Sequence, residues 1–347
     1  MKFKIVALFG ICVLALGLIV VMDASQAQAK DVVTWRLPMH HTTISSPVYE
    51  HSIMRIINLV KERSEGRFII EPYLSGTLIP GTEIFNSVKR GMVPIGHTTP
   101  AYDMAQVPIF NVVAGLPMNF GDVWEAAYFF QWLGFEQMVR EEVLKKHGML
   151  YYSDRVYTTE LSLKKPVRSI DDFKGLKLRS SGILQKYLTS IGAAASMIPG
   201  GDIYAALASG MMDGAHWGAV QGSYAMKFYE VNKYHLRPAL NVAATDIWLI
   251  NKRAFDSLPE DLQDILHTTL QEHFWPRTNQ YMYQEEIMLQ KAIKENGVTL
   301  LTMPPEEFNK MQVAAMKIWD EVAAISPECA KAVEMLKDFN RSMGRMQ

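Results

Sequence analysis

Three short segments, residues 171–179 (DDFKGLKLR), 199–207 (PGGDIYAAL) and 210–215 (GMMDGA), decide the fold class of this chain. The first is an apolar strand that ends on Arg179 and leads into a helix, and the second opens a short helix that Gly210 stops. The same alternation of extended and helical signals runs through most of the chain. Strands that alternate with helices are typical of an α/β protein, which is the fold class that we predict.

Working outward from these segments, the pattern predicts two lobes joined by crossover strands. An apolar strand over residues 242–250 is expected to return the chain to the first lobe, and long helical patterns dominate after Pro259. In one helix predicted over residues 122–147, the side chains Trp124, Ala127, Tyr128 and Trp132 have the spacing of a buried face. The predicted first lobe comprises residues 30–153 and 241–275, and the second comprises residues 154–240 with part of 276–347 and the C-terminal helices.

The first 29 residues have the features of an export signal. Lys2 and Lys4 precede an apolar run over residues 5–21, and small residues at 27–29 provide a cleavage site near Ala29. The run is marginal in length for a membrane span, so a retained single helix is the alternative. We expect soluble export to the periplasm, after which Cys329 is the only cysteine left and cannot form an internal disulfide.

Composition and motifs argue against several functional classes. With 35 Lys and Arg against 36 Asp and Glu, the net charge of −1 does not indicate a nucleic-acid partner. The sequence holds no Gly-rich phosphate loop and none of the common hydrolase or zinc-protease signatures. Neighbours on a strand point to opposite faces, so His40 and His41 are not expected to share a metal. Glu285 and Glu286, in a charged helical pattern, are predicted to be solvated.

In their order along the chain, the three opening segments resemble the signature region of the substrate-binding proteins of TRAP transporters, the DctP family. Residues 76–78 (GTL), Glu83 and residues 91–96 resemble a further segment of that family. The resemblance implies a two-lobed type II periplasmic solute-binding fold with a long C-terminal helix bridging the lobes. It also implies a small organic carboxylate in the interlobe cleft, TRAP membrane permease subunits as partners, a monomeric state, no cofactor and no catalysis.

Arg179 is the predicted anchor of the ligand. It ends an apolar strand, and the carboxyl edge of the strands in an α/β sheet faces a cleft. A guanidinium presents a fork that matches a carboxylate in bidentate fashion. In the family that the chain resembles, the matching arginine holds the substrate carboxylate. The alternative is a structural arginine paired with an internal acid.

The pair His216 and Trp217 narrows the resemblance to the subgroup that binds 2-oxo and 2-hydroxy monocarboxylates. In that subgroup a Glu-Trp pair occupies this place, and the Glu helps to hold a metal ion that bridges to the substrate. His216 replaces that acid here, and an imidazole suits an oxygen-rich cation site poorly, so no metal is expected. Gly218 and Ala219 replace bulkier residues and leave room beside Trp217. A larger aromatic carboxylate is therefore the alternative to a 2-oxo acid.

Four further residues are candidate ligand contacts. Arg155 follows a strand near the predicted crossover and either contacts the ligand or braces Arg179. Tyr102 and His41 follow first-lobe strands and either line the cleft or pack at the surface, and Trp248 belongs to the returning strand or reaches the ligand. Two rival functions stay open at this point. One is a carboxylate-binding protein that serves a sensor kinase, and the other is a periplasmic lyase or isomerase that uses His216 as acid or base.

Overall fold

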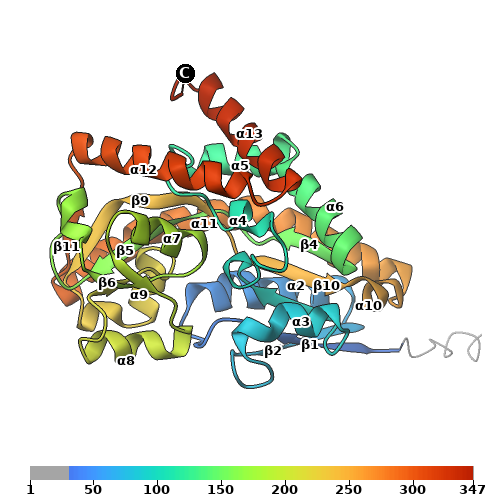
Figure 1. Cartoon of the computed structure of the whole chain (residues 1–347). Coiled ribbons are helices and arrows are strands. Elements are labelled where there is room, and N and C mark those ends of the chain that lie inside the picture. Colours follow the sequence, from blue (N-terminus) through green and yellow to red (C-terminus); the bar gives the residue numbers. More distant parts are fainter. Residues whose placement is uncertain (1–30, 347) are drawn as a thin grey trace, which may run out of the picture. The chain divides into compact units, whose positions relative to one another are not determined.

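Eleven strands pair into three sheets in the computed structural model, which describes residues 31–346. The export signal predicted over residues 1–29 lies outside the described residues. A two-stranded sheet holds β1 (Val33–Pro38) and β2 (Phe68–Tyr73), and a three-stranded sheet has the order β3 (Ile95–Thr98), β10 (Ile247–Asn251), β4 (Met149–Ser153). The six-stranded sheet has the order β11 (Thr299–Thr302), β9 (Tyr234–Ala244), β5 (Tyr157–Leu163), β8 (Gly214–Ala215), β6 (Lys177–Arg179), β7 (Ala194–Ser196). Figure 1 labels β10 and β4 of the three-stranded sheet, and β11, β9, β5 and β6 of the six-stranded sheet.

Helices separate most of these strands, which confirms the predicted α/β class. They are α2 (Arg55–Arg63), α3 (Ile84–Lys89), α4 (Phe110–Val113), α5 (Val123–Trp132), α6 (Phe135–His147), α7 (Gly182–Ser190), α8 (Ile203–Ala208), α9 (Val220–Ala225), α10 (Lys252–Asp256), α11 (Glu260–Asn296), α12 (Pro305–Ala323) and α13 (Pro327–Ser342). Shorter helical turns are η1 (Tyr49–Met54), η2 (Gly81–Glu83), η3 (Pro100–Tyr102), η4 (Ile170–Phe173), η5 (Gly200–Asp202) and η6 (Phe228–Glu230). No helix within residues 31–346 combines the length and the apolar character that a membrane span requires.

The chain passes three times between the three-stranded and the six-stranded sheet, twice by short connections and once, from β10 to β11, through α10 and α11. Residues 154–156 lead from β4 to β5, and residues 245–246 lead from β9 back to β10. The single strand predicted over residues 242–250 is therefore two strands, interrupted where Asp246 stands between apolar runs. The two short connections lie side by side, because the backbone amide of Asp154 donates to the Asp246 carbonyl at 2.8 Å.

The prediction of one helix over residues 122–147 is wrong in two respects. Gly134, at φ +83°, separates α5 from α6, because this left-handed conformation cannot continue a helix. The predicted buried face is also mostly exposed, as Trp124 and Trp132 are 54% and 70% accessible. Aromatic residues occur on most sides of α5 itself, so their spacing along the sequence could not predict which face of the helix is buried. The side chains that α5 buries are Val123, Ala126, Ala127, Phe129 and Phe130.

Helix α11 contacts elements that flank both larger sheets. In its N-terminal half Glu272 pairs with Arg63 of α2 at 2.7 Å. In its C-terminal half the Tyr281 carbonyl accepts a hydrogen bond of 2.8 Å from the Gln221 amide of α9. Pro276 lies between these contacts, inside the 37-residue helix. This long helix fits the bridging helix that the family resemblance implies.

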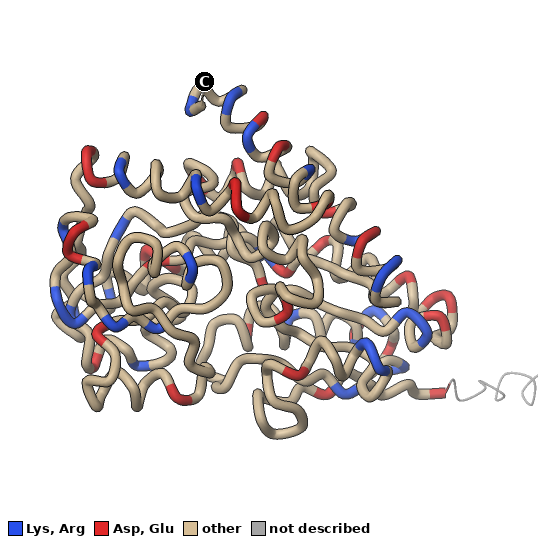
Figure 2. The backbone as a smooth tube through the Cα atoms, viewed as in Figure 1, with Lys and Arg blue, Asp and Glu red and all other residues tan. Residues whose placement is uncertain are grey.

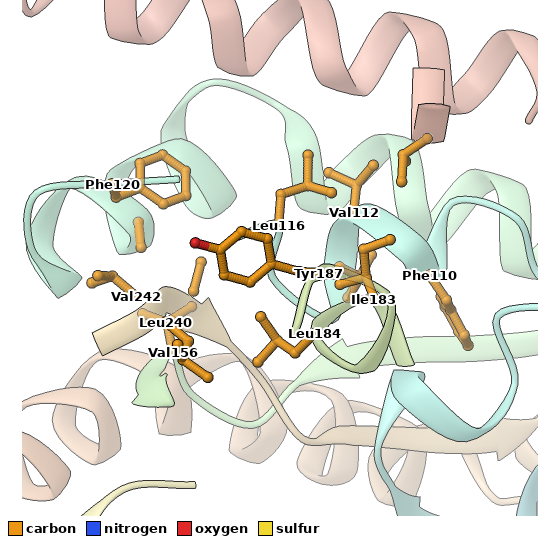
Figure 3. Packing of buried hydrophobic residues seen from close by; sticks show 14 of the residues in the cluster. Phe110, Val112, Leu116, Phe120, Val156, Ile183, Leu184, Tyr187, Leu240 and Val242 are labelled. Atoms are coloured by element: carbon orange, nitrogen blue, oxygen red, sulfur yellow. The ribbon is translucent and has the colours of Figure 1, made fainter. Parts of the chain in front are cut away.

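The main apolar core includes residues of α4, α7 and β9. Figure 3 shows Tyr187 of α7 among side chains that include Leu116 and Leu240, and the Tyr187 hydroxyl donates to the Met311 carbonyl at 3.0 Å. On the outer helices both charge signs alternate along α12 and α13 (Figure 2), with Lys337 and Asp320 paired at 2.8 Å. This mixing agrees with the near-neutral composition of the chain.

Candidate functional site

A cavity with an empty volume of about 570 Å³, counted to its solvent-facing mouth, lies where strand ends and connections meet. Tyr102 of η3 and the segment after β1 contribute to one part of its lining, and the ends of β6 and β8 contribute to another. Both short connections between the larger sheets also reach it. The cavity therefore occupies the place where α/β folds bind ligands, beyond the ends of their strands. Five of the seven predicted site residues line it, namely His41, Tyr102, Arg155, Arg179 and Trp217.

Arg179 is a buried cation without an acidic partner. It is 1% exposed, and within residues 31–346 it forms no ion pair with a carboxylate. Its Nε donates to the Ile198 carbonyl at 3.0 Å and one Nη donates to the His216 carbonyl at 2.8 Å, whereas Nη2 is buried without a hydrogen-bond partner. Burial lowers the Arg179 pKa, while the facing Tyr102 phenol opposes that shift. Among the described residues, Arg179 is therefore not paired with an internal acid, which was the alternative role predicted for it.

Trp217 forms an aromatic wall beside Arg179. The Trp217 ring centre lies 5.1 Å from the Arg179 guanidinium carbon. The ring centre of His40 lies 6.1 Å from that of Trp217. Two glycines make room for the indole segment. A Cβ at Gly200 would lie 2.5 Å from the indole ring, and one at Gly222 would lie 1.8 Å from the Trp217 carbonyl oxygen. The position of the wall thus depends on both glycines.

Arg155 is held by charges from both connections. Its Nη1 pairs with Asp154, and its Nη2 lies 3.0 Å from Asp246 Oδ2. Its guanidinium also lies over the rings of Tyr157 and Tyr281, at 4.5 and 4.8 Å. Arg155 lines the cavity. Bracing Arg179 was the alternative role predicted for Arg155, but the partners named here do not include Arg179.

Two predicted residues do not line the cavity. His216 is 8% exposed, and its Nδ1 lies 2.9 Å from the Ser180 hydroxyl. Burial, together with the nearby Arg179, lowers the pKa of His216 well below its usual value. Trp248 is a core residue of β10 whose Nε1 donates to Asp154 Oδ1 at 3.0 Å. Both act on the cavity only through the residues that they hold.

The expectation that His40 and His41 point apart is wrong. Their ring centres are 4.0 Å apart, and their Nε2 atoms lie 3.3 and 3.6 Å from the two oxygens of Asp246. The strand rule fails because β1 ends at Pro38 and the histidines lie beyond it. Both rings line the cavity, and burial lowers the pKa of His41 to about 3, which leaves its imidazole neutral. His97 of β3 stacks behind them, with ring centres 5.8 and 5.6 Å away.

The prediction that Glu285 is solvated is wrong. Glu285 is buried, because it accepts hydrogen bonds from the segment that follows Trp217. It accepts hydrogen bonds from the Val220 and Gln221 amides at 2.7 and 3.2 Å, and from Gln221 Nε2 at 2.9 Å. Burial raises the pKa of Glu285 to about 7. The cavity-lining Gln221 is thereby fixed to α11.

Sequence reasoning missed Asp246, Asp154 and Tyr281. Asp246 carried a usable signal, since a lone carboxylate inside an apolar run is a buried charge that needs partners. His97, at the end of the short strand β3, carried the same kind of signal as a buried polar ring. Tyr281 carried no signal, because its helix continues with many aromatic residues and only the fold selects which of them faces the cavity.

Comparisons with known proteins agree with this architecture. A family model described as bacterial extracellular solute-binding protein, family 7 (DctP) matches residues 39–325. A periplasmic protein of Nostoc sp. that is named for binding monocarboxylate 2-oxoacids is 25% identical over 296 residues, covering 82% of this chain and 78% of the relative. The solved structure of a TRAP transporter solute-binding protein from Bordetella bronchiseptica RB50, with calcium and picolinate, has a TM-score of 0.82 at 22% identity and covers 90% of this chain and 93% of that one. One from Pseudoalteromonas atlantica T6c, with bound sodium and pyruvate, has a TM-score of 0.81 at 23% identity, with 90% and 95% coverage.

The paired connections, the two larger sheets and the cavity at their meeting point define a two-lobed solute-binding protein of type II. The chain belongs to family 7 of the bacterial extracellular solute-binding proteins, the DctP family. Proteins of this family are the substrate-binding receptors of TRAP transporters.

Proposed function

We propose that this protein captures a small organic carboxylate for a TRAP transporter and that Arg179 holds the carboxylate. The observation that carries the proposal is the unpaired guanidinium: Arg179 is buried, faces the cavity and has an Nη2 without a partner. A buried charge without a partner is costly, and a carboxylate would supply both the charge and the acceptors that the fork lacks.

The charges around the cavity favour an anion. Asp154 and Asp246 are ionised, since the neighbouring Arg155 opposes the effect of burial and holds the pKa of each well below its usual value. These two carboxylates face the guanidiniums of Arg155 and Arg277. Arg179 has no such counterpart, so the bound ligand is expected to bring a negative charge.

The size and lining of the cavity support two ligand classes. A 2-oxo monocarboxylate fits the name of the Nostoc relative, and pyruvate and picolinate appear with the two similar structures. The aromatic wall of Trp217, with Gly218 beside it, also suits a carboxylate that carries a ring. We propose that the pocket accepts both.

We further propose that the protein binds without catalysing a reaction. His216, the candidate acid or base from the sequence, is turned toward Ser180 and does not line the cavity. Its lowered pKa disfavours the protonated form that a general acid needs. Capture followed by delivery to the membrane permease subunits is the role that this arrangement supports. A monomer, exported with cleavage near Ala29, completes the proposal.

The lobe limits are part of the same proposal. The first lobe would hold residues 30–153 and the segment returning from residue 241 to 275, and the second would hold residues 154–240 with part of 276–347 and the C-terminal helices. The connection at residues 154–156 supports the first limit, because the strands before and after it pair in different sheets. Because β9 continues to Ala244 in the six-stranded sheet, the connection at residues 245–246 supports a return there, a few residues later than residue 241. Ligand capture would then take place between the lobes, next to both connections.

Calorimetry with a panel of organic acids tests the carboxylate proposal. A ligand that binds only the native state also raises the thermal midpoint, which allows a rapid first screen. We expect Arg179→Ala to remain folded and to weaken binding of the best acid by about 2–5 kcal/mol. Arg237→Ala is the matched control, because Arg237 is paired with Glu160 and Glu286 and does not line the cavity. Equal affinity in wild type and Arg179→Ala would remove Arg179 from the site.

A further inference from the structure

Three imidazole rings and one carboxylate gather at the cavity wall. His40, His41 and His97 each offer a nitrogen within 4.8 Å of the nitrogens of the other two. The Asp246 carboxylate lies 3.3 Å from His40, 3.6 Å from His41, and within 4.8 Å of a nitrogen of His97. The four side chains come from the segment after β1, from β3 and from the connection between β9 and β10. Only the fold brings these donors together.

The ring nitrogens of this cluster are buried, and the nearest carboxylate oxygens, those of Asp246 and Asp154, lie 3.3–3.8 Å from them. Both nitrogens of His40 and of His97, and Nε2 of His41, have no hydrogen bond, although the three residues are at most 6% exposed. Buried polar atoms in folded proteins nearly always have a partner, so a group of them points to a water molecule or an ion that binds there.

The donor chemistry selects the kind of ion. Neutral imidazoles with one carboxylate suit Zn²⁺ and related transition-metal cations, whereas Ca²⁺ and Mg²⁺ prefer oxygen ligands throughout. Donors around one tetrahedral zinc ion lie about 3.3 Å apart. The three imidazoles form one group with donors within 4.8 Å of one another, and Asp246 belongs to a second group through His97, so the side chains must move closer together around a bound ion. Behind the cluster, Asp154 Oδ1 lies 3.8 Å from His97 Nε2, where a carboxylate orients a ligating histidine.

We propose that His40, His41, His97 and Asp246 form a site for a divalent transition-metal cation of the Zn²⁺ type in the wall of the ligand cavity. His40, His41 and Asp246 line the cavity, which gives the metal a route from solvent and leaves a coordination position facing the ligand. The site lies apart from His216, where the family resemblance implied a metal-holding acid. It revises the expectation that His40 and His41 do not share a metal, which rested on the strand rule.

Zinc binding by the purified protein, measured without any carboxylate, tests this site separately from the proposed function. After chelator treatment and desalting, we expect calorimetry to show one Zn²⁺ per chain and a raised thermal midpoint, with no such effect of Ca²⁺ or Mg²⁺. His41→Gln and His97→Gln should each weaken Zn²⁺ binding at least tenfold. His267→Gln is the matched control, because His267 bonds the Tyr152 hydroxyl outside the cluster. Arg179→Ala should bind Zn²⁺ as the wild type does.

Two results would overturn the site: a wild type that does not bind Zn²⁺ saturably, or His41→Gln and His97→Gln variants that bind it like His267→Gln. Circular dichroism of each variant without metal checks that it is folded. Should His97→Gln fail to fold, the result with His41→Gln decides, because His41 lies at the cavity surface. Loss of carboxylate binding in the Arg179→Ala variant would leave the zinc result unaffected.

Discussion

Arg155 and Asp246 join the two short connections between the larger sheets, with Arg155 Nη2 3.0 Å from Asp246 Oδ2. The partners stand 91 residues apart in the sequence, and each follows or precedes a strand of the three-stranded sheet. A backbone hydrogen bond from Asp154 to Asp246 reinforces the link. The pair is buried, so its two charges depend on each other.

Removing Arg155 is expected to destabilise the fold. Arg155→Met leaves the carboxylates of Asp154 and Asp246 without their shared cation, and breaking a buried pair costs about 3–5 kcal/mol. Urea unfolding at neutral pH measures this loss. Lys337→Met, which breaks a more exposed pair with Asp320, is the control and should cost less than about 1 kcal/mol. Equal stability of both variants would mean that the connections do not depend on this pair.

Trp217 is expected to favour ligands with a ring. Its indole forms the wall next to Arg179, and ring stacking contributes about 0.5–1.5 kcal/mol beyond the buried area. Trp217→Ala should therefore weaken the binding of an aromatic carboxylate more than it weakens the binding of pyruvate. Calorimetry with both acids on both proteins gives the comparison. An equal loss for the two acids would contradict this account of the wall, while leaving Arg179 as the anchor.

Gly222 and Gly201 provide a matched pair of substitutions. Alanine normally stabilises a helix by about 1 kcal/mol relative to glycine, and Gly222 lies in α9. Here the added Cβ would lie 1.8 Å from the Trp217 carbonyl oxygen, so Gly222→Ala must displace that segment. We expect lower stability and weaker ligand binding. Gly201→Ala, whose Cβ meets open space, should leave both properties near wild type. Thermal unfolding and calorimetry on both variants check the contrast.

Asp103 should make the protein less stable as the pH rises toward neutrality. Burial, with a smaller effect of the Glu83 charge, raises the Asp103 pKa to about 7 in the fold from 3.8. The folded state therefore favours the protonated acid. This contribution to stability is complete below about pH 4 and is lost as the pH rises through about 7.

Asp103→Asn removes that dependence, because an amide stays neutral at every pH. Relative to wild type, the variant should gain free energy of unfolding between pH 5 and pH 8, by about 3 kcal/mol at most. Urea unfolding at the two pH values measures the change, and Asp338→Asn at an exposed position is the control. A constant difference between variant and wild type would show that Asp103 does not titrate in this range.

The sequence predicted the α/β class, the family and the placement of Arg179 because these depend on local signals. A strand that ends on an arginine before a helix can be recognised from spacing alone, and the motif order identified the family. The exposed aromatic residues Trp124 and Trp132 could not be predicted, since α5 is apolar on all sides and tertiary packing selects its buried face.

Two predictions for the site failed, one at residues beyond the end of a strand and one inside helix α11. His40 and His41 were judged as strand residues, but β1 ends before them and their rings turn toward the same carboxylate. Glu285 was judged by the charged residues around it, whereas the amides at the start of α9 draw it inward. Both errors arise from contacts with residues that are distant in the sequence, and the periodicity of a segment cannot predict such contacts.

Pro276 interrupts the helical hydrogen bonds of α11 shortly before Tyr281, which lines the cavity. A proline has no amide hydrogen, so the carbonyl one turn earlier, at Glu272, loses its helical partner, and a helix bends most easily at such a place. The next residue is Arg277, and Tyr281 follows one turn later over the guanidinium of Arg155. Bending of the long helix would therefore tilt the tyrosine that covers Arg155. The long helix that contacts both larger sheets thus has its most easily bent turn five residues before a side chain that lines the cavity.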